Sequence, residues 1–395
     1  MHIALYSHDT MGVGSFCRNL TIARALAQSG LNAKILMLAG AGVTGLYYIP
    51  KNVDVLPLPA LQKDFSGVYS SSPLTLSLNK RLAMRSSTIA RALKSFKPDV
   101  FIVDSVPWGV GGELDESFSA LCRNTGGMRV VLGVKDIIDD PSAVKTEWAR
   151  RANFSAIRAY FDEVWMYGDS RFYNAVHEYA FPGDIAAKVK FTGYFNRQGI
   201  ADMSVADKPR APTLADLNLP RAKTVLCMVG GGRDGAAIAD VFSRVELPGC
   251  YNGVIVTGPY MPDDIRNALR ERMRHASHWR VIDFHPDPQR LLRDADAVMT
   301  MGGYNAISDV LCLNKPTLVI PRVEPCREQL IRARRLAALQ LADMCHPSQC
   351  TPEALSMWLS GVEERCDVEK LQLNFNGLAR LPGLVMGLSR RRVAG

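Results

Sequence analysis

The chain has 395 residues, of which 47% are hydrophobic and 22% are charged, and its formal net charge is +8. This length and composition predict a soluble globular protein of two domains, and the absence of any run of about 18 apolar residues excludes a membrane-spanning helix. The first residues form no export signal, so we expect a cytoplasmic protein.

The nine cysteines are scattered and include no Cys-x-x-Cys pair, which predicts reduced thiols rather than a disulfide framework or a structural metal. His346 lies between Cys345 and Cys350, but this stretch supplies too few ligands for a metal site. The positive net charge favours anionic partners such as nucleotide sugars or phospholipid headgroups. No basic stripe interleaved with aromatic residues occurs, so we expect no nucleic-acid binding.

A strand–helix–strand unit opens the chain. Residues 3–7 are typical of a strand, residues 11–15 of a glycine-containing turn, and residues 16–29 of a helix that ends at Gly30. The turn contains Gly12 and Gly14 but lacks the third glycine of a dinucleotide-binding fingerprint. A second strand is predicted at residues 33–38.

Further strands alternate with helices through the first half, which predicts a parallel, doubly wound sheet. Ligands bind beyond the carboxyl ends of the strands in such sheets. We expect strands at 53–58, 100–104, 129–134, 164–167 and 189–192, and a basic amphipathic helix at 82–94. The candidate site of the first half consists of the polar residues at the strand ends, which are Ser7, His8, Asp9, Asp104, Ser105, Lys135, Asp136 and Gly168.

The composition changes at residue 196 to a linker-like mixture of Asp, Pro, Ala and Arg. A second series of strands and helices then begins, with strands at 224–229, 253–258 and 280–284, a glycine turn at 230–235 and a helix at 236–245. The predicted organisation is therefore a first domain at 1–195, a linker at 196–222, a second domain at 223–370 and a helical tail at 371–395 that packs back across the domains.

The stretch 298–322 contains a strand, the pair Gly302–Gly303, a helix and another strand. Unpaired N–H groups and the positive end of the dipole coincide at such a helix start, which predicts a phosphate site. Asp309 follows about one turn later and is placed to accept from a ribose or sugar hydroxyl. The alternative is a tight turn of the kind found in any α/β protein.

The chain resembles GT-B glycosyltransferases, and most closely the family-28 type that includes the N-acetylglucosaminyltransferase forming lipid II of the cell wall. Residues 231–236 resemble the family's GGSxGA turn. Residues 303–309 resemble its glycine turn and the following helix that ends in an acid, usually Glu. Residues 321–329 resemble the loop that ends in Gln-Gln or Asp-Gln, here Glu328–Gln329.

The whole chain also resembles a bacterial group of predicted glycosyltransferases near that family. The resemblance rests on a Pro-x-Gly-x-x-Gly-Glu-Leu segment at 107–114 and an Asp-Ile-x-Asp-Asp-Pro segment at 136–141. One departure concerns the first glycine turn, where much of the superfamily has a His and this chain has Ser15. The general base is therefore assigned from strand ends, with Asp136 first, His8 second and Asp104 third, and with Asp9 as a further nearby acid.

The resemblance implies two Rossmann-like, doubly wound parallel-sheet domains that face across a cleft, the first binding an acceptor and the second a nucleotide sugar. The implied acceptor or cleft residues are Gly12, Gly14, Ser15 and Glu113. The implied donor-binding residues are Gly231, Gly232, Arg233, Phe284, Gly302, Gly303, Asn305, Asp309, Arg322, Glu328 and Gln329.

Each assignment has a structural alternative. The glycines also suit tight turns, and Gln329 also suits the start of a helix. Phe284 also suits the hydrophobic core, and Arg233 and Arg322 also suit the protein surface. Asp136 also suits a helix cap. Asp294 and Asp296 are predicted to lie within a helix, and not to hold a metal.

The predicted activity is metal-independent, inverting transfer of a sugar from a nucleotide donor, with UDP favoured, to an undefined acceptor and without a cofactor. A nucleotide-sugar epimerase or hydrolase, or a non-catalytic nucleotide-sugar-binding protein, are the alternatives. Residues 371–392 have an apolar body and a basic end, which fits either weak peripheral contact with anionic lipid or a packed terminal helix. Pro382 and the glycines are expected to interrupt a continuous amphipathic helix there. Composition specifies no oligomeric state.

Overall fold

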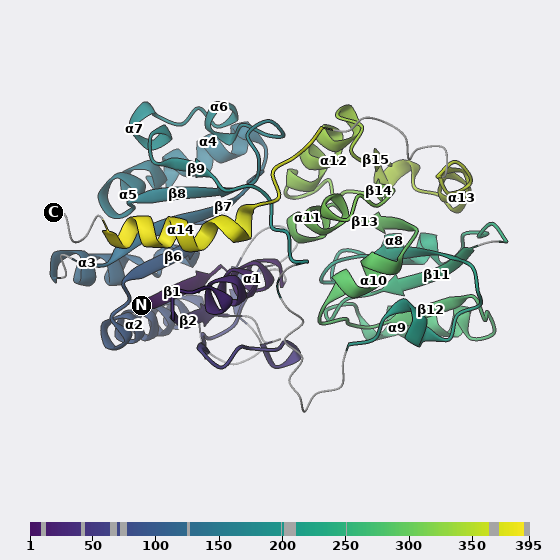
Figure 1. Ribbon diagram of the computed structural model, residues 1–395, viewed down its shortest axis with the longest axis horizontal. Helices are drawn as coiled ribbons and strands as arrows, with labels where there is room; N and C mark the ends of the chain where they lie inside the picture. The colour runs from purple at the N-terminus through teal and green to yellow at the C-terminus, as the bar shows by residue number, and fades with distance from the viewer. Residues whose placement is uncertain are drawn as a thin grey trace. The chain divides into compact units, whose positions relative to one another are not determined.

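The computed structural model divides into two compact units, each an α/β layer structure around a parallel sheet (Figure 1). The first unit joins Met1–Met203 to Leu373–Gly395, and the second comprises Ser204–Gln372. The structure describes residues 1–8, 13–40, 44–63, 69–71, 77–124, 127–198, 200, 211–249, 251–362 and 371–390.

The first unit contains a seven-stranded sheet of order β3-β2-β1-β6-β7-β8-β9, in which every pairing is parallel. The strands β6 and β8 are buried at every position, as expected for strands covered on both faces. The bounds are β1 (His2–Ser7), β2 (Lys34–Ala39), β3 (Val53–Pro57), β6 (Val100–Asp104), β7 (Arg129–Lys135), β8 (Glu163–Tyr167) and β9 (Val189–Phe191), with a separate antiparallel pair β4 (Leu61–Lys63) and β5 (Tyr69–Ser71).

The switch point of this sheet lies between β1 and β6. Strand β1 pairs with β2 on one side and with β6 on the other, so the chain departs in opposite directions from these two strands. Their carboxyl ends, at Ser7 and Asp104, therefore border the crevice where open α/β sheets bind ligands.

Helix α1 of the first unit begins at Gly14, close to its predicted start at residue 16. Helix α2 is longer than expected because the Ser77 hydroxyl accepts a hydrogen bond from the Lys80 N–H and caps its start, while Lys97 ends it in the left-handed conformation. The helices are α1 (Gly14–Gln28), α2 (Leu78–Phe96), α3 (Asp115–Asn124), α4 (Pro141–Arg150), α5 (Asn153–Tyr160), α6 (Ala175–Glu178), α7 (Gly183–Ala186) and α14 (Gly377–Arg390), with 3₁₀ turns at Thr44–Leu46 and Val110–Gly112.

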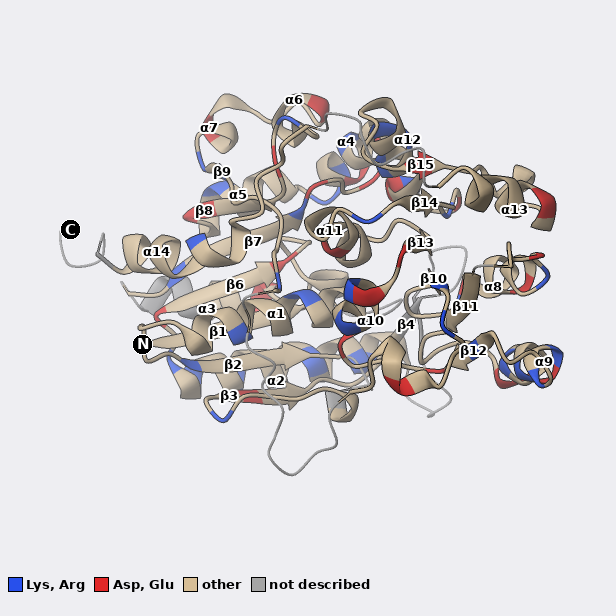
Figure 2. Ribbon diagram, turned by 45° about the vertical axis from the view of Figure 1, so that its right-hand side comes forward, with Lys and Arg blue, Asp and Glu red and all other residues tan. Residues whose placement is uncertain are grey.

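Helix α14 returns to the first unit and corrects the expectation of an interrupted helix. It is continuous with Pro382 inside it, and its apolar stripe of Leu381, Val385 and Leu388 is buried against α1 and β6. This burial outweighs the backbone N–H that proline removes. Figure 2 shows α14 largely without charged residues. Within the described parts of the chain, no helix has both the length and the apolar character to cross a membrane.

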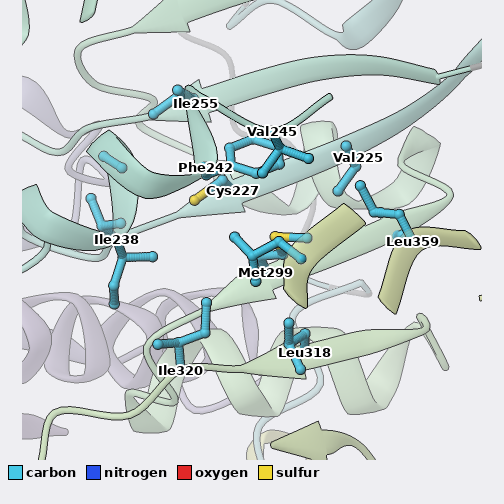
Figure 3. Close-up of a cluster of buried hydrophobic side chains, with 14 of the residues drawn as sticks. Val225, Cys227, Ile238, Phe242, Val245, Ile255, Met299, Leu318, Ile320 and Leu359 are labelled. Carbon is cyan, nitrogen blue, oxygen red and sulfur yellow. The ribbon is translucent and has the colours of Figure 1, made fainter. Parts of the chain in front are cut away.

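The second unit contains a six-stranded parallel sheet of order β12-β11-β10-β13-β14-β15, with its switch point between β10 and β13. Figure 3 shows part of its core, where Cys227 of β10 and Met299 of β13 lie near Phe242 of α8. The strands are β10 (Lys223–Met228), β11 (Tyr251–Val256), β12 (Trp279–Ile282), β13 (Ala297–Thr300), β14 (Thr317–Val319) and β15 (Asp343–Met344).

The helices of the second unit alternate with these strands along the chain. Helix α9 begins with two acidic residues and ends with basic ones, which suits its dipole (Figure 2). The helices are α8 (Ala236–Phe242), α9 (Asp263–Met273), α10 (Pro288–Asp294), α11 (Tyr304–Cys312), α12 (Glu328–Ala338) and α13 (Pro352–Ser360), with 3₁₀ turns at Leu214–Leu217 and Pro347–Gln349.

In the second unit, the predicted linker contains local structure near its end, and one expectation about a helix is wrong. The end of the predicted linker forms a 3₁₀ turn, in which Thr213 and Asp216 make a reciprocal capping box. Helix α10 ends at Asp294, so Asp296 is not helical. Its carboxylate instead accepts from the Thr224 N–H at 2.7 Å and ties the start of β10 to the start of β13.

Candidate functional site

Glycines let the loops after β10 and β11 approach each other backbone to backbone. Gly232 has φ of +91°, and a Cβ there would lie 2.1 Å from the Thr257 carbonyl oxygen. A Cβ on Gly258 would lie 2.3 Å from the Gly230 oxygen. The Tyr260 N–H also donates to the Gly231 oxygen at 2.8 Å. The glycine turn at the end of β10 is therefore required by packing, whatever it binds.

The second loop follows β13 and leads into α11. Gly302 has φ of +84°, and its carbonyl accepts from Arg332 Nη1 at 2.9 Å, with the Arg332 side chain fully buried in α12. Gly303 occupies the N-cap of α11, where no side chain caps the helix and a Cβ would meet no atom within 4 Å. The uncapped N–H groups at this helix start suit an anion.

The third loop follows β14 and leads into α12. The Arg322 N–H donates to Gln329 Oε1 at 2.9 Å, so the Gln329 side chain holds the loop backbone. The Arg322 guanidinium reaches Asp234 of the first loop at 3.0 Å and lies 3.9 Å from the Glu328 carboxylate. With 19% of its side chain exposed, Arg322 joins the first and third loops while remaining accessible.

The Asp309 carboxylate is held from a neighbouring helix. It is 2% exposed on α11 and accepts a hydrogen bond from Gln289 Nε2 of α10 at 2.7 Å. Burial, together with the negative charge of Asp309, raises the pKa of the Cys312 thiol to about 11. Asn305, on the first turn of α11, is half-buried, as is Arg233 in the first loop.

Phe284 follows β12 and is half-buried beside a fixed histidine. His285 Nδ1 accepts from the Asp287 N–H, so Nε2 carries the hydrogen and donates to the Pro212 carbonyl at 2.8 Å. Burial lowers the pKa of His285 below its ordinary value. His285 therefore acts as a neutral brace between residue 212 and the end of β12.

In the first unit, a buried ion pair occupies the switch point. Arg18 of α1 donates to Asp104 at the end of β6, with Nη2 2.7 Å from each carboxylate oxygen and Nε 2.9 Å from Oδ1. The side chains are 4% and 0% exposed. Arg18 Nη2 also lies 3.3 Å from the hydroxyls of Ser15 and Ser105. Asp104, one of the predicted candidate bases, is thus ion-paired with Arg18, and no sequence motif indicated this pair.

Asp136, the first candidate base, is 1% exposed. One of its oxygens accepts from the Ile137 N–H at 2.8 Å, and the other accepts from the Tyr194 hydroxyl at 2.9 Å. The Asp136–Pro141 segment also starts α4, because Asp140 caps that helix and Pro141 occupies its first position. The segment therefore has a structural role in this unit.

Glu113 lies in a second buried network. It accepts from the Tyr6 hydroxyl at 2.5 Å and from Arg85 Nε and Nη2 at 2.5 and 2.7 Å, and Glu113 and Arg85 are fully buried as side chains. Burial and the Glu113 charge hold the pKa of Tyr6 well above its ordinary value, so the hydroxyl remains a donor. Gly109, Gly111 and Gly112 nearby have positive φ, which explains the glycine spacing of this segment.

The remaining predicted residues of the first unit lie near the end of β1. His8 and Ser15 are half-buried, and Gly14 is the first residue of α1. Gly12 and Asp9 lie outside the described residues.

Sequence reasoning missed three residues that organise these sites, namely Arg18, Gln289 and Arg332. Arg18 and Arg332 are charged residues on the buried faces of amphipathic helices, a pattern that signals a buried partner. Gln289 offers no such signal. Among the described residues, no three His, Cys, Asp or Glu side chains come together as a metal-binding group.

These two doubly wound sheets and their glycine loops place the protein in the GT-B class. Residues 225–367 match the Glycosyltransferase family 28 C-terminal domain. The chain is a glycosyltransferase whose second unit carries this family 28 domain.

Two curated relatives are UDP-N-acetylglucosamine--N-acetylmuramyl-(pentapeptide) pyrophosphoryl-undecaprenol N-acetylglucosamine transferases. The protein of Bacteroides thetaiotaomicron is 24% identical over 370 residues, which cover 91% of this chain and 89% of the relative. The protein of Leuconostoc citreum is 28% identical over 99 residues, which cover 24% of this chain and 27% of the relative.

Solved structures share the fold at low identity. MurG of Acinetobacter baumannii is 15% identical with a TM-score of 0.55, over 98% of this chain and 99% of that one. A putative UDP-N-acetylglucosamine 2-epimerase from Listeria monocytogenes is 12% identical with a TM-score of 0.62, over 98% of this chain and 96% of that one. Both of these solved structures therefore share the architecture of this chain.

Proposed function

We propose that the chain transfers a sugar from a UDP-linked donor, held by the second unit, to an acceptor held by the first. The observation that carries the donor part is the connection of three loops at the carboxyl ends of β10, β13 and β14. Arg322 joins the first loop to the third, and Arg332 joins the second loop to α12. Connected loops around one switch point form a preorganised ligand site.

Each loop offers a different kind of contact. The N–H groups after Gly302 and Gly303 suit the diphosphate, and Arg322 and Arg233 supply positive charge beside it. Asp309 accepts from the ribose hydroxyls, Phe284 lies against the base, and Glu328 with Gln329 binds sugar hydroxyls, as the family resemblance implies. When the sugar binds in this scheme, the Gln329 side chain either replaces its hydrogen bond from the Arg322 N–H with one to the sugar or makes both hydrogen bonds.

The choice of UDP is supported by the names of the relatives. The Bacteroides protein is named for a UDP-N-acetylglucosamine donor and a pyrophosphoryl-undecaprenol acceptor. We extend the UDP donor to this chain and propose a lipid-linked acceptor that brings it into weak peripheral contact with the membrane. The acceptor's head group stays undefined.

The proposed transfer is inverting and needs no metal, because cationic side chains and helix N-termini stabilise the leaving diphosphate. It needs a base near the acceptor hydroxyl. We propose His8, because Asp104 is ion-paired with Arg18 and both oxygens of Asp136 accept hydrogen bonds. An imidazole has an ordinary pKa near neutral pH, which suits general-base catalysis.

Isothermal titration tests the donor site first. We expect UDP and UDP-N-acetylglucosamine to bind the full chain, and a thermal shift to accompany binding, because a ligand at about 100 times its dissociation constant stabilises by about 2.7 kcal/mol. If no nucleoside diphosphate or sugar conjugate binds, the proposal is wrong.

Transfer is then tested with the UDP sugar that binds and a bacterial lipid extract, with UDP release as the readout. His8→Ala should slow transfer by about 10²- to 10⁴-fold without weakening UDP binding, whereas an unchanged rate would rule out His8 as the base.

An epimerase or hydrolase is the second candidate, because the Listeria epimerase structure has a higher TM-score than the Acinetobacter transferase. Ser15, at the position where much of the superfamily has a histidine, weighs against it. UDP release without any acceptor at the full turnover rate would identify a hydrolase. Interconversion of the sugar without net UDP release would identify an epimerase.

A further inference from the structure

The hydrogen bond between Gln289 and Asp309 joins two helices inside the second unit. Gln289 is 4% exposed near the start of α10, and Asp309 is 2% exposed on α11, with 2.7 Å between Nε2 and Oδ1. An ionised carboxylate only accepts hydrogen bonds, so the amide NH₂ group must face it. The bond therefore has a defined direction, from α10 to α11.

This contact helps to set the orientation of the Asp309 carboxylate. The terminal torsion of an aspartate is broad and permits many orientations of the carboxylate plane. A donor on a separate helix restricts that plane, because it bonds one particular oxygen. The carboxylate is then oriented before a ligand arrives, which lowers the entropy lost on binding.

We infer that Gln289 is a positioning residue that orients Asp309 toward the ribose hydroxyls of the donor, and that the pair selects a ribonucleotide over a 2′-deoxyribonucleotide. This inference rests on the proposed donor site. The effect of Gln289 passes through its hydrogen bond to Asp309 and requires no contact between Gln289 and the donor. A 2′-deoxy donor removes one hydroxyl that the oriented carboxylate would accept from, so it binds more weakly.

The test compares UDP with 2′-deoxy-UDP by isothermal titration on the full chain. The wild-type protein should bind UDP about tenfold or more tightly than 2′-deoxy-UDP. Gln289→Met removes the amide and keeps the side-chain length. It should weaken UDP about tenfold or more and should weaken 2′-deoxy-UDP, which keeps only the 3′-hydroxyl, much less, so that the preference largely disappears.

A matched control is Gln349→Met, the same chemical change at an exposed position in the same unit. It should alter neither affinity. Asp309→Asn should also abolish the preference, and adding Gln289→Met to Asp309→Asn should change it no further, because the two side chains act as one group. Gln289→Ala repeats the measurement if the methionine variant folds poorly.

The outcomes separate this inference from the proposed donor. If UDP binds and Gln289→Met weakens both nucleotides equally, or weakens neither, Gln289 is only a helix brace and the inference is overturned while the donor site stands. If Asp309→Asn leaves the preference intact, the ribose role of the pair is overturned. If the wild-type protein binds no nucleoside diphosphate, the donor proposal and the inference fail together.

Discussion

The two switch points of this glycosyltransferase are built differently. In the first unit, the ends of β1 and β6 are bordered by charges that neutralise each other inside the protein, with Arg18 on Asp104 and Arg85 on Glu113. In the second unit, the loops after β10 and β13 are shaped by glycines, and the cation Arg322 stays partly exposed. The ion pairs near the first switch point are buried, whereas the pair of Arg322 with Asp234 in the second unit is partly exposed.

The difference teaches how to read a charged residue at a strand end. A buried ion is costly to desolvate, so separating it from its partner would leave an uncompensated buried charge. A half-exposed pair contributes little to stability and can exchange its partner for a ligand. Burial of an ion pair at such a site therefore indicates that its members hold the fold, whereas partial exposure leaves them available to a ligand.

The first and largest expected effect concerns Glu113→Ala, which leaves the Arg85 cation buried without its carboxylate. We expect the free energy of unfolding of the first unit to fall by about 3–5 kcal/mol in urea denaturation. The exposed Glu116→Ala serves as the control and should change it by less than about 0.5 kcal/mol. The double variant Arg85→Met/Glu113→Leu should recover much of the loss. A loss below about 1 kcal/mol in Glu113→Ala would contradict the structural role of this pair.

The second prediction concerns two glycines of the loops after β10 and β13. Gly232→Ala places a Cβ 2.1 Å from the Thr257 oxygen at a φ of +91°, so it should destabilise the second unit by at least about 2 kcal/mol. Gly303→Ala has open space and φ of −61°, so it should cost less than about 0.5 kcal/mol. Thermal and urea unfolding of both variants measure the contrast. Equal losses of unfolding free energy in the two variants would show that the backbone around Gly232 shifts easily to accommodate a Cβ.

The third prediction concerns Arg322→Gln. Its ion pair with Asp234 is partly exposed, so the unfolding free energy should change by less than about 1 kcal/mol. The affinity for UDP should fall about tenfold or more, because a charged donor to the diphosphate is lost. Titration calorimetry checks this against Asp234→Asn, which releases Arg322 and should not weaken UDP. A large loss of stability with unchanged UDP affinity would place Arg322 with the structural arginines of the first unit.

The fourth and smallest effect concerns His285 and pH. Burial depresses its pKa in the folded chain, so the unfolded chain takes up the proton first as the pH falls below about 6.5. The second unit should therefore lose stability from about pH 6.5 downward until the folded-state pKa is reached, by at most about 1.4 kcal/mol per pH unit. His285→Gln keeps a donor for the Pro212 carbonyl and does not titrate. Urea denaturation between pH 5 and 7.5 should show a shallower slope for this variant, and identical slopes would contradict the assignment.

Local pattern was sufficient for the longer strands of the two parallel sheets and for the positions of the glycine loops after β10 and β13, but it did not predict the short strands β4, β5 and β15. Continuous apolar runs predict β6 and β10, and the glycines after β10 and β13 predict tight turns because only glycine tolerates those φ values and approaches. Helix α2 was predicted short because the Ser77 cap lies upstream of the periodic apolar residues. Helix α14 continues through Pro382 because its apolar side chains are buried, and the local sequence does not show what they pack against.

The contacts that define the sites could not be predicted, because their partners are distant in the chain. Arg18 and Asp104 are 86 residues apart, and Arg322 and Asp234 are 88 apart. The sequence shows a carboxylate at a strand end, as at Asp104, but it does not show which cation the fold brings against it. For this reason the sequence correctly located the strand end at Asp104. It did not predict the ion pair with Arg18, which makes Asp104 less suited to act as a base.

The return of residues 371–390 to the first unit affects the order in which the chain matures. The Tyr194 N–H donates to the Asn374 carbonyl, the Gly377 N–H donates to the Tyr194 carbonyl, and Arg380 bonds the Phe191 carbonyl at the end of β9. The second unit is therefore an insertion within the first. During synthesis from the N-terminus, the first unit cannot complete its packing until the second has been translated. The second unit is the contiguous one, so it is the part that we expect to reach its native state first.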